Sequence, residues 1–178
     1  MIVSGTNPVG IDLRIFELQT VLESVLCNNV DTRFNWPSDT VIYGKIQKTV
    51  KNGNTIPELY SGNGEYIQPF IDDRVSASLA FVVNSYSLTN RFPIADVDLI
   101  ITADLVKIFG NQERNTAKAI TNIYNAIQGH CLSLGAIKEG INDVFKNFSG
   151  IKDYQPSDLS QWFVFSINFK ITFDSKLN

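Results

Sequence analysis

Three aspartates in one short stretch are the residues of this chain whose types and spacing could do chemistry. Asp96, Asp98 and Asp104 lie within residues 95–105, where odd positions are apolar and even positions are mostly polar. Successive side chains of a β-strand point to opposite faces, so all three carboxylates are expected on one face of one strand. Paired carboxylates can hold Mg²⁺ or act as general acid and base.

Three interpretations of these carboxylates differ in what surrounds them. A metal-dependent hydrolase needs ligands that converge from several elements and a basic group for the substrate, and neither is visible near Asp96, Asp98 and Asp104. The alternatives are a solvated sheet face and a channel-facing surface that repels DNA phosphates and lets DNA pass without sticking. We expect the solvated or channel-facing acidic surface, with no metal and no cofactor.

The remaining reactive residues lack a setting that would make them catalytic. His130 and Cys131 are adjacent, so their side chains point in different directions, and no nucleophile motif surrounds them. The Gly62-Asn63-Gly64 stretch lacks the third glycine of a dinucleotide-binding fingerprint. We therefore predict a non-enzymatic protein in which His130 is a capping or loop residue. Cys27 and Cys131 are far apart in sequence and are expected to be free thiols.

Composition limits the class of protein further. The 178 residues suit one domain, and the formal net charge is −3 with 15 Lys and Arg residues scattered along the chain. A scattered basic content disfavours a surface that binds nucleic acid through its phosphates. The N-terminus lacks the pattern of a signal peptide, and no apolar run approaches 18 residues, so we expect a soluble protein made in the cytosol without membrane contact.

The clearest structural pattern lies near the end of the chain, at residues 162–173. Every odd position from Phe163 to Phe173 is apolar, and the even positions are polar after Val164. This period of two predicts a long strand with one face in a core. Such a strand needs a sheet beside it and a layer that covers its apolar face.

The other patterns supply that sheet and that layer. The sequence predicts helices at 10–27, 112–128 and, more weakly, 137–148, and strands at 40–50, 75–83 and 95–105. The strands at 75–83 and 95–105 are joined by a short turn and should pair antiparallel. The predicted fold is α+β: an antiparallel (mixed) β-sheet packed on one face by helices, with an N-terminal helix and two late helices.

Two segments fall outside this regular pattern. Residues 1–10 are expected to form an N-terminal arm before a single domain that spans 11–178. Residues 52–69 hold so many Gly, Asn and Pro residues that we expect an extended loop, with only 65–67 resembling a strand. A loop of this length suits binding, and a flexible hairpin tip is the other interpretation.

This layout resembles the tail terminator and tail completion proteins of tailed bacteriophages, which join head to tail. The residues that carry the resemblance are the helix at 11–26, the strand pair 75–83 and 95–105, the helix at 117–127 and the strand at 162–173. It implies a structural protein of the virion, located in the tail or neck and assembled in the host cytoplasm. The implied role is a ring that caps the tail tube and joins it to the head.

The resemblance also implies partners. These are further copies of the chain, most simply in a hexameric ring, and the tail tube and neck or connector proteins, while DNA passes without specific binding. The loop 52–69 and the arm 1–10 are expected to reach a neighbouring subunit, because such segments have little internal cohesion. The candidate contact residues are Asn54, Ile56, Pro57, Leu59, Tyr60 and Tyr66. The alternatives are a small non-catalytic binding module of a phage-like or secretion assembly, and the metal-dependent hydrolase.

Overall fold

A computed structural model of the chain describes residues 1–5, 7–28, 35–51, 53–62, 64–67, 72, 74–88, 92–110, 115–148 and 162–174. The predicted α+β class is confirmed. The strands are β1 Ile2–Val3, β2 Val41–Lys45, β3 Gln47–Lys51, β4 Asn54–Gly62, β5 Glu65–Ile67, β6 Ala77–Leu88, β7 Pro93–Asp104, β8 Ser133–Glu139 and β9 Trp162–Thr172. The helices are α1 Ile11–Leu26, α2 Leu105–Phe109, α3 Thr116–Ile127 and α4 Ile141–Val144, with a 3-10 turn η2 at Gln128–His130.

Six strands form the main sheet in the order β1-β2-β6-β7-β9-β8. The pairs β1–β2 and β2–β6 are parallel, and the remaining pairs are antiparallel, so the sheet is mixed. The predicted antiparallel pairing of the two middle strands is confirmed, with Leu79 opposite Ile101. β9 pairs with β7 along its whole length, from Trp162 opposite Asp104 to Thr172 opposite Ile94.

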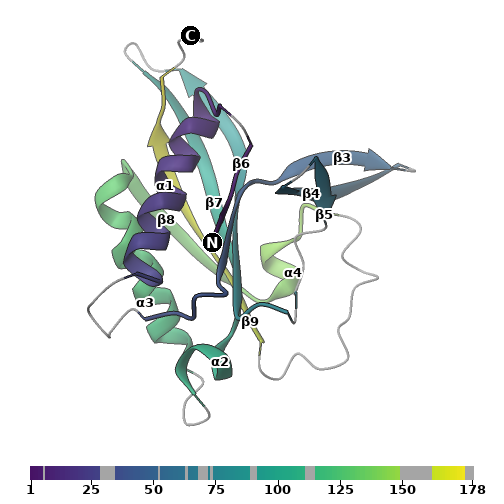
Figure 1. The fold of residues 1–178 in the computed structure, drawn as a ribbon. Helices are drawn as coiled ribbons and strands as arrows, with labels where there is room; N and C mark the ends of the chain where they lie inside the picture. Colours follow the sequence, from purple (N-terminus) through teal and green to yellow (C-terminus); the bar gives the residue numbers. More distant parts are fainter. Residues whose placement is uncertain are drawn as a thin grey trace.

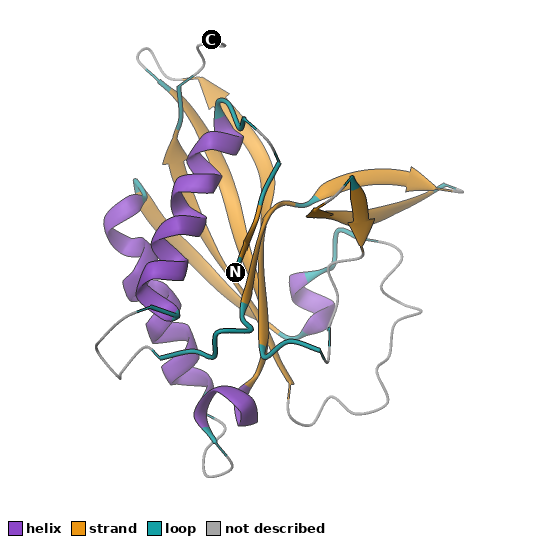
Figure 2. Ribbon diagram, viewed as in Figure 1, coloured by secondary structure: helices purple, strands orange, loops and turns teal. Residues whose placement is uncertain are grey.

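The main core lies between this sheet and the helices α1 and α3, which cover the same face (Figures 1 and 2). The alternation predicted for β9 is confirmed, since Phe165, Ile167, Phe169 and Ile171 are all buried there. Ile15, Leu18 and Leu22 of α1 lie one helical turn apart and present one apolar stripe to these strands. A single polar side chain of α1, Gln19, is buried with them and donates to the carbonyl oxygens of Val3 and Ile42.

The opposite face of the sheet carries a second, smaller core. Val82, Ile100 and Val164 pack there against Val144, Phe145 and Phe148 around α4, and against residues at the start of the three-stranded sheet described below. The sequence predicted a sheet covered on one face. That expectation is wrong where Ala80, Val82, Ile100 and Val164, at even positions of the central strands, form this second cluster.

Three predicted elements differ from the structure. The late helix at 137–148 is wrong: Ser133–Glu139 is strand β8, and only α4 at Ile141–Val144 is helical. The strand at 40–50 divides into β2 and β3, which belong to different sheets, so Ile42 is buried while Val50 is exposed. The residues predicted to form an arm contribute β1 to the main sheet, with Ile2 opposite Ile42.

The predicted extended loop at 52–69 is also corrected, within the residues of it that the structure describes. Asn54–Gly62 and Glu65–Ile67 are strands β4 and β5, which join β3 in a second, antiparallel sheet. Gly53, Gly62 and Gly64 have positive φ angles, a conformation that suits glycine and turns the chain sharply. The density of Gly and Asn therefore marks the turns of a hairpin and not a long irregular segment.

Candidate functional site

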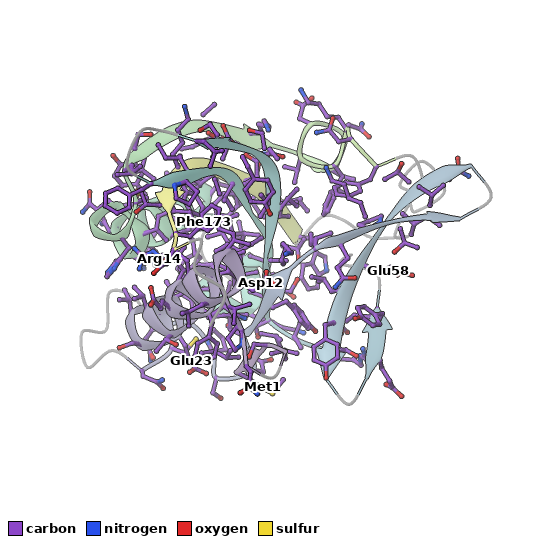
Figure 3. All side chains as sticks on the ribbon, turned by 90° about the horizontal axis from the view of Figure 1, so that it is seen from above. Met1, Asp12, Arg14, Glu23, Glu58 and Phe173 are labelled. Carbon is purple, nitrogen blue, oxygen red and sulfur yellow. The ribbon has the colours of Figure 1, made fainter. Side chains whose placement is uncertain are left out.

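The β3–β4–β5 sheet stands away from the rest of the molecule (Figure 1). Its strands follow β2 directly, and only Ile46 separates β2 from β3. The amide of Ile46 donates to the carbonyl oxygen of Phe81 in the main sheet, so the chain leaves that sheet at this point. In the view from above, Glu58 on this projecting sheet lies well apart from Arg14 and Glu23 on α1 (Figure 3). We call β3, β4 and β5 the projecting sheet.

The projecting sheet has a buried root and an exposed tip. At the root, Ile46 and Leu59 are buried in the second core, where the side chain of Leu59 is 2% exposed. At the tip, Val50 is 71% exposed. A large aliphatic side chain with this exposure contributes almost nothing to the monomer's own core.

The six predicted contact residues divide between these two regions. Asn54 and Tyr66 are exposed, and Ile56 and Tyr60 are partly exposed, so all four remain available to a neighbour. Pro57 and Leu59 are buried within the monomer, which corrects their assignment as contact residues. The physical reason is that β4 is the central strand of its sheet and lies against the body of the protein at its root.

A groove of about 440 Å³ lies where the projecting sheet meets the main body. Its wall includes an ion pair between Lys45 and Asp12, with Nζ and Oδ1 2.7 Å apart. Tyr60 and Tyr66 line the same groove, and their rings meet edge to face with centroids 5.7 Å apart. The described residues between Val3 and Val9 also line the groove. The groove brings the N-terminal segment and two predicted contact residues together.

The three aspartates predicted to share one face do so, but they do not form one site. Asp104 is buried and caps helix α2, where its Oδ1 accepts hydrogen bonds from the amides of Val106 and Lys107 at 3.0 and 3.1 Å. Asp98 is also buried, and its Oδ2 lies 3.1 Å from Nζ of Lys138. The predicted solvated acidic surface is therefore wrong for Asp98 and Asp104, and only Asp96 stays partly exposed.

Asn168 links the carboxylates of Asp96 and Asp98. Its amide nitrogen donates to Oδ1 of Asp96 at 2.7 Å and to Oδ1 of Asp98 at 2.8 Å. Burial alone would raise the pKa of Asp98, but hydrogen bonds from Asn168, Lys138 and Asn84 outweigh burial, and the pKa lies below its ordinary value. These partners hold Asp98 as a paired carboxylate that stabilises the sheet.

The other candidates for chemistry are also dispersed. Within the described ranges, no group of three or more His, Cys, Asp or Glu side chains could hold a metal ion. His130 lies exposed in η2, as predicted for a residue that follows a helix, and its carbonyl oxygen accepts from Arg14. Cys27 and Cys131 are free, as expected, and burial raises the pKa of both thiols. None of the helices that the structure describes has the length and apolar character of a membrane span.

The sequence did not predict strand β8, which is an edge strand of the main sheet. β8 pairs with β9 through one edge, and no described strand pairs with its outer edge. Most of its side chains are exposed, including Ile137, and exposed Leu132 lies just before it. The apolar spacing from Ile137 to Phe148 concealed this strand, and Gly140, a poor helix residue within the predicted helix, was the signal against it.

A second exposed apolar area lies at the end of the main sheet. A bulge between Val83 and Ser85 shifts the alternation of β6, so that Tyr86 and Leu88 lie opposite Ala95 and Pro93. Tyr86 contacts Phe173 edge to face, with ring centroids 5.8 Å apart, and Leu88 is 86% exposed. This end of the sheet keeps apolar side chains in water.

Comparison of the chain with protein-family models, with curated proteins and with solved structures finds no match.

Proposed function

We propose that this protein is a structural protein of a tailed phage virion, which forms a homo-oligomeric ring at the head–tail junction or the top of the tail. In this role it caps the tail tube and joins the tail to the head, and DNA passes through the ring without specific binding. The protein acts by assembly and not by catalysis.

The observation that carries this proposal is the presence of two unlike strand edges in one molecule. The projecting sheet follows β2, near one edge of the main sheet, and β8 is the strand at the opposite edge of that sheet. Unlike surfaces favour head-to-tail contacts, in which each subunit offers one surface to the next. Head-to-tail contacts close into a ring when the rotation between neighbours divides a full turn evenly.

Charge supports the passage of DNA. The formal net charge is −3, and an acidic protein repels phosphates at the range of a channel wall. Asp98 and Asp104 are engaged inside the monomer and take no part in this effect. Of the three predicted acidic residues, Asp96 alone retains partial exposure for such a role.

A second candidate function rests on the groove at the root of the projecting sheet. A groove of about 440 Å³ with two tyrosine rings and an ion pair on its wall has the size of a small ligand site. In that case the protein is a small binding module that remains a monomer or dimer.

Electron microscopy of the purified protein separates the two candidates. A ring-forming subunit gives particles with rotational symmetry and a central opening, whatever small molecules are present. A binding module gives only particles of one or two chains, and this result would contradict the ring.

A further inference from the structure

We propose that the outer edge of β8 in one subunit pairs with the outer edge of β3 in the next subunit, so that the projecting sheet extends the neighbour's main sheet. This inference rests on the proposed ring and names the contact that builds it. The occupant of the β8 edge is thus a second copy of this chain.

The edge of β8 is suited to accept another strand. An open edge presents unpaired backbone N–H and C=O groups, and proteins commonly protect such edges with outward lysines, bulges or covering segments. The lysine of β8, Lys138, is turned inward to Asp98, with its Nζ 3.1 Å from Oδ2. The bulge lies before Ile137, so residues 137–139 run in regular register with β9. The regular part of the edge thus has no outward lysine of its own, and Asp143 and Lys146 line a hollow beside residues 137–139.

The edge of β3 is the better of the two edges that the projecting sheet offers. The order β3-β4-β5 leaves β3 and β5 outermost, and β3 has five residues where β5 has three. β3 also carries Val50, whose side chain has no core to enter in the monomer. Burial of an aliphatic side chain of this size against a neighbour stabilises the contact.

One antiparallel register satisfies both the apolar and the charged side chains. When Val50 stands opposite Ile137, Lys48 stands opposite Glu139, because pairing advances one strand while it recedes along the other. Val50 and Ile137 are both exposed large aliphatic residues. Glu139 is the charged residue that β8 leaves exposed, since Lys138 is paired with Asp98. Lys48 is exposed on β3, with its Nζ 5.7 Å from the centroid of the Phe148 ring in the same chain. Opposite charges directly across two strands attract.

The two edges are unlike, so each subunit can offer β8 to one neighbour and β3 to another. The same pair of edges recurs at each interface of a ring, and each subunit uses both edges once. In a two-fold dimer the same two subunits would exchange both edges, and the disulfide products described below distinguish the two arrangements.

The test exchanges the charges of Lys48 and Glu139 in separate proteins. Lys48→Glu places two glutamates across the contact, and Glu139→Lys places two lysines there, so each variant alone should need about tenfold more protein to assemble. In an equal mixture, the two variants can alternate around a ring with an even number of subunits. Every interface then pairs opposite charges. The mixture should assemble at the wild-type concentration.

A crosslink checks the register independently of charge. In a background with Cys27→Ala and Cys131→Ala, the pair Val50→Cys and Ile137→Cys should form intermolecular disulfides under mild oxidation. The expected product is a ladder of covalent multimers that ends at the closed ring. The matched control Val50→Cys with unchanged Ile137 should yield at most covalent dimers.

The outcomes distinguish this contact from the proposed function. If wild-type protein forms rings but both charge variants assemble equally well and no disulfide ladder appears, the β8–β3 contact is wrong and the ring remains. A covalent dimer as the sole product of the double cysteine protein means a two-fold contact and contradicts the inference. If wild-type protein forms no ring, the proposed function fails, and this contact fails with it.

Discussion

Asn168 is the residue on which the polar part of the sheet depends, because one amide group holds two carboxylates that would otherwise repel each other. It donates to Asp96 and Asp98, while Lys138 neutralises Asp98 from the far side. Hydrogen bonds to a charged group typically contribute about 1.5–3 kcal/mol to stability. The network therefore stabilises the fold at neutral pH, and it has a pH dependence of definite sign.

Asp98→Asn should destabilise the protein at pH 7 by about 1–3 kcal/mol, since it removes the charge that pairs with Lys138. The pKa of Asp98 is lowered in the folded protein, so its contribution is complete above the pKa of the unfolded chain, about 4. The contribution is lost as the pH falls through the folded pKa. Urea unfolding at pH 7 and pH 3 should show a difference between the two proteins that shrinks in acid.

The exposed carboxylate of Asp143 provides the control for this series. Asp143→Asn should change the free energy of unfolding by less than about 0.5 kcal/mol at either pH. If the Asp98→Asn protein is as stable as wild type at pH 7, the hydrogen bonds of Asp98 do not stabilise the fold.

The position of the Asn168 side chain depends on Gly135, which leaves room for it. A Cβ atom at this position would lie 2.5 Å from Oδ1 of Asn168 and would force that side chain to move. Gly135→Ala should therefore cost about 1–3 kcal/mol in thermal or urea unfolding. Gly129→Ala is the matched control, since nothing lies within 4 Å of its Cβ position. Equal stability of the two variants would mean that Asn168 moves freely.

At the scale of elements, β9 is the strand that the sequence predicts best and the one on which the core depends. Ile167 lies between Leu99 of β7 and Ile137 of β8 and is fully buried. Ile167→Asp buries an unpaired carboxylate and should remove most or all of a stability margin of about 5–15 kcal/mol. Circular dichroism should show an unfolded chain, and a melting temperature like that of wild type would refute the assignment of Ile167 to the core.

Shortening a side chain should have different effects at the root and at the tip of the projecting sheet. Leu59→Ala should destabilise the monomer by about 2–5 kcal/mol, because Leu59 is buried in the second core. Val50→Ala should leave monomer stability within about 0.5 kcal/mol and weaken assembly alone. Denaturant midpoints of dilute, dissociated protein measure the first effect, and the concentration needed for assembly measures the second. Equal monomer destabilisation by both changes would contradict the division into root and tip.

These elements show which parts of a sequence carry enough information to be predicted. β9 was predictable because its alternation over eleven residues reflects one buried face. β8 was not, because Ile137 and the apolar residues after it fall at helical spacing while belonging to a strand and a short helix. In α3, Ala119 and Ala126 face the core, while Ala117 and Tyr124 are exposed.

The candidate site was less predictable than the fold, since its partners are distant in sequence. Lys138 lies 40 residues from Asp98, and Asn168 lies 70 residues from it. Only the folded sheet brings these three side chains together, so alternation could place the aspartates on one face without revealing that Asp98 is buried. The projecting sheet was hidden because the Gly and Asn residues of its turns are also typical of a long irregular loop.

At the scale of the whole molecule, two unlike strand edges would allow the proposed ring to assemble by a single kind of contact. The projecting sheet follows β2, near one edge of the main sheet, and β8 is the strand at the opposite edge. Repetition of one heterologous contact gives either a closed ring or an open filament, and the proposed cap for a tail tube needs a closed ring.

Native mass spectrometry of the wild-type protein over a range of concentrations tests closure most directly. The chain has a mass of 19.9 kDa, so six copies give about 119 kDa. A closed ring gives one dominant assembly whose mass is a fixed multiple of 19.9 kDa and stays constant as the concentration rises. A monomer at all concentrations, or a series of species that lengthens with concentration, would contradict the closed ring.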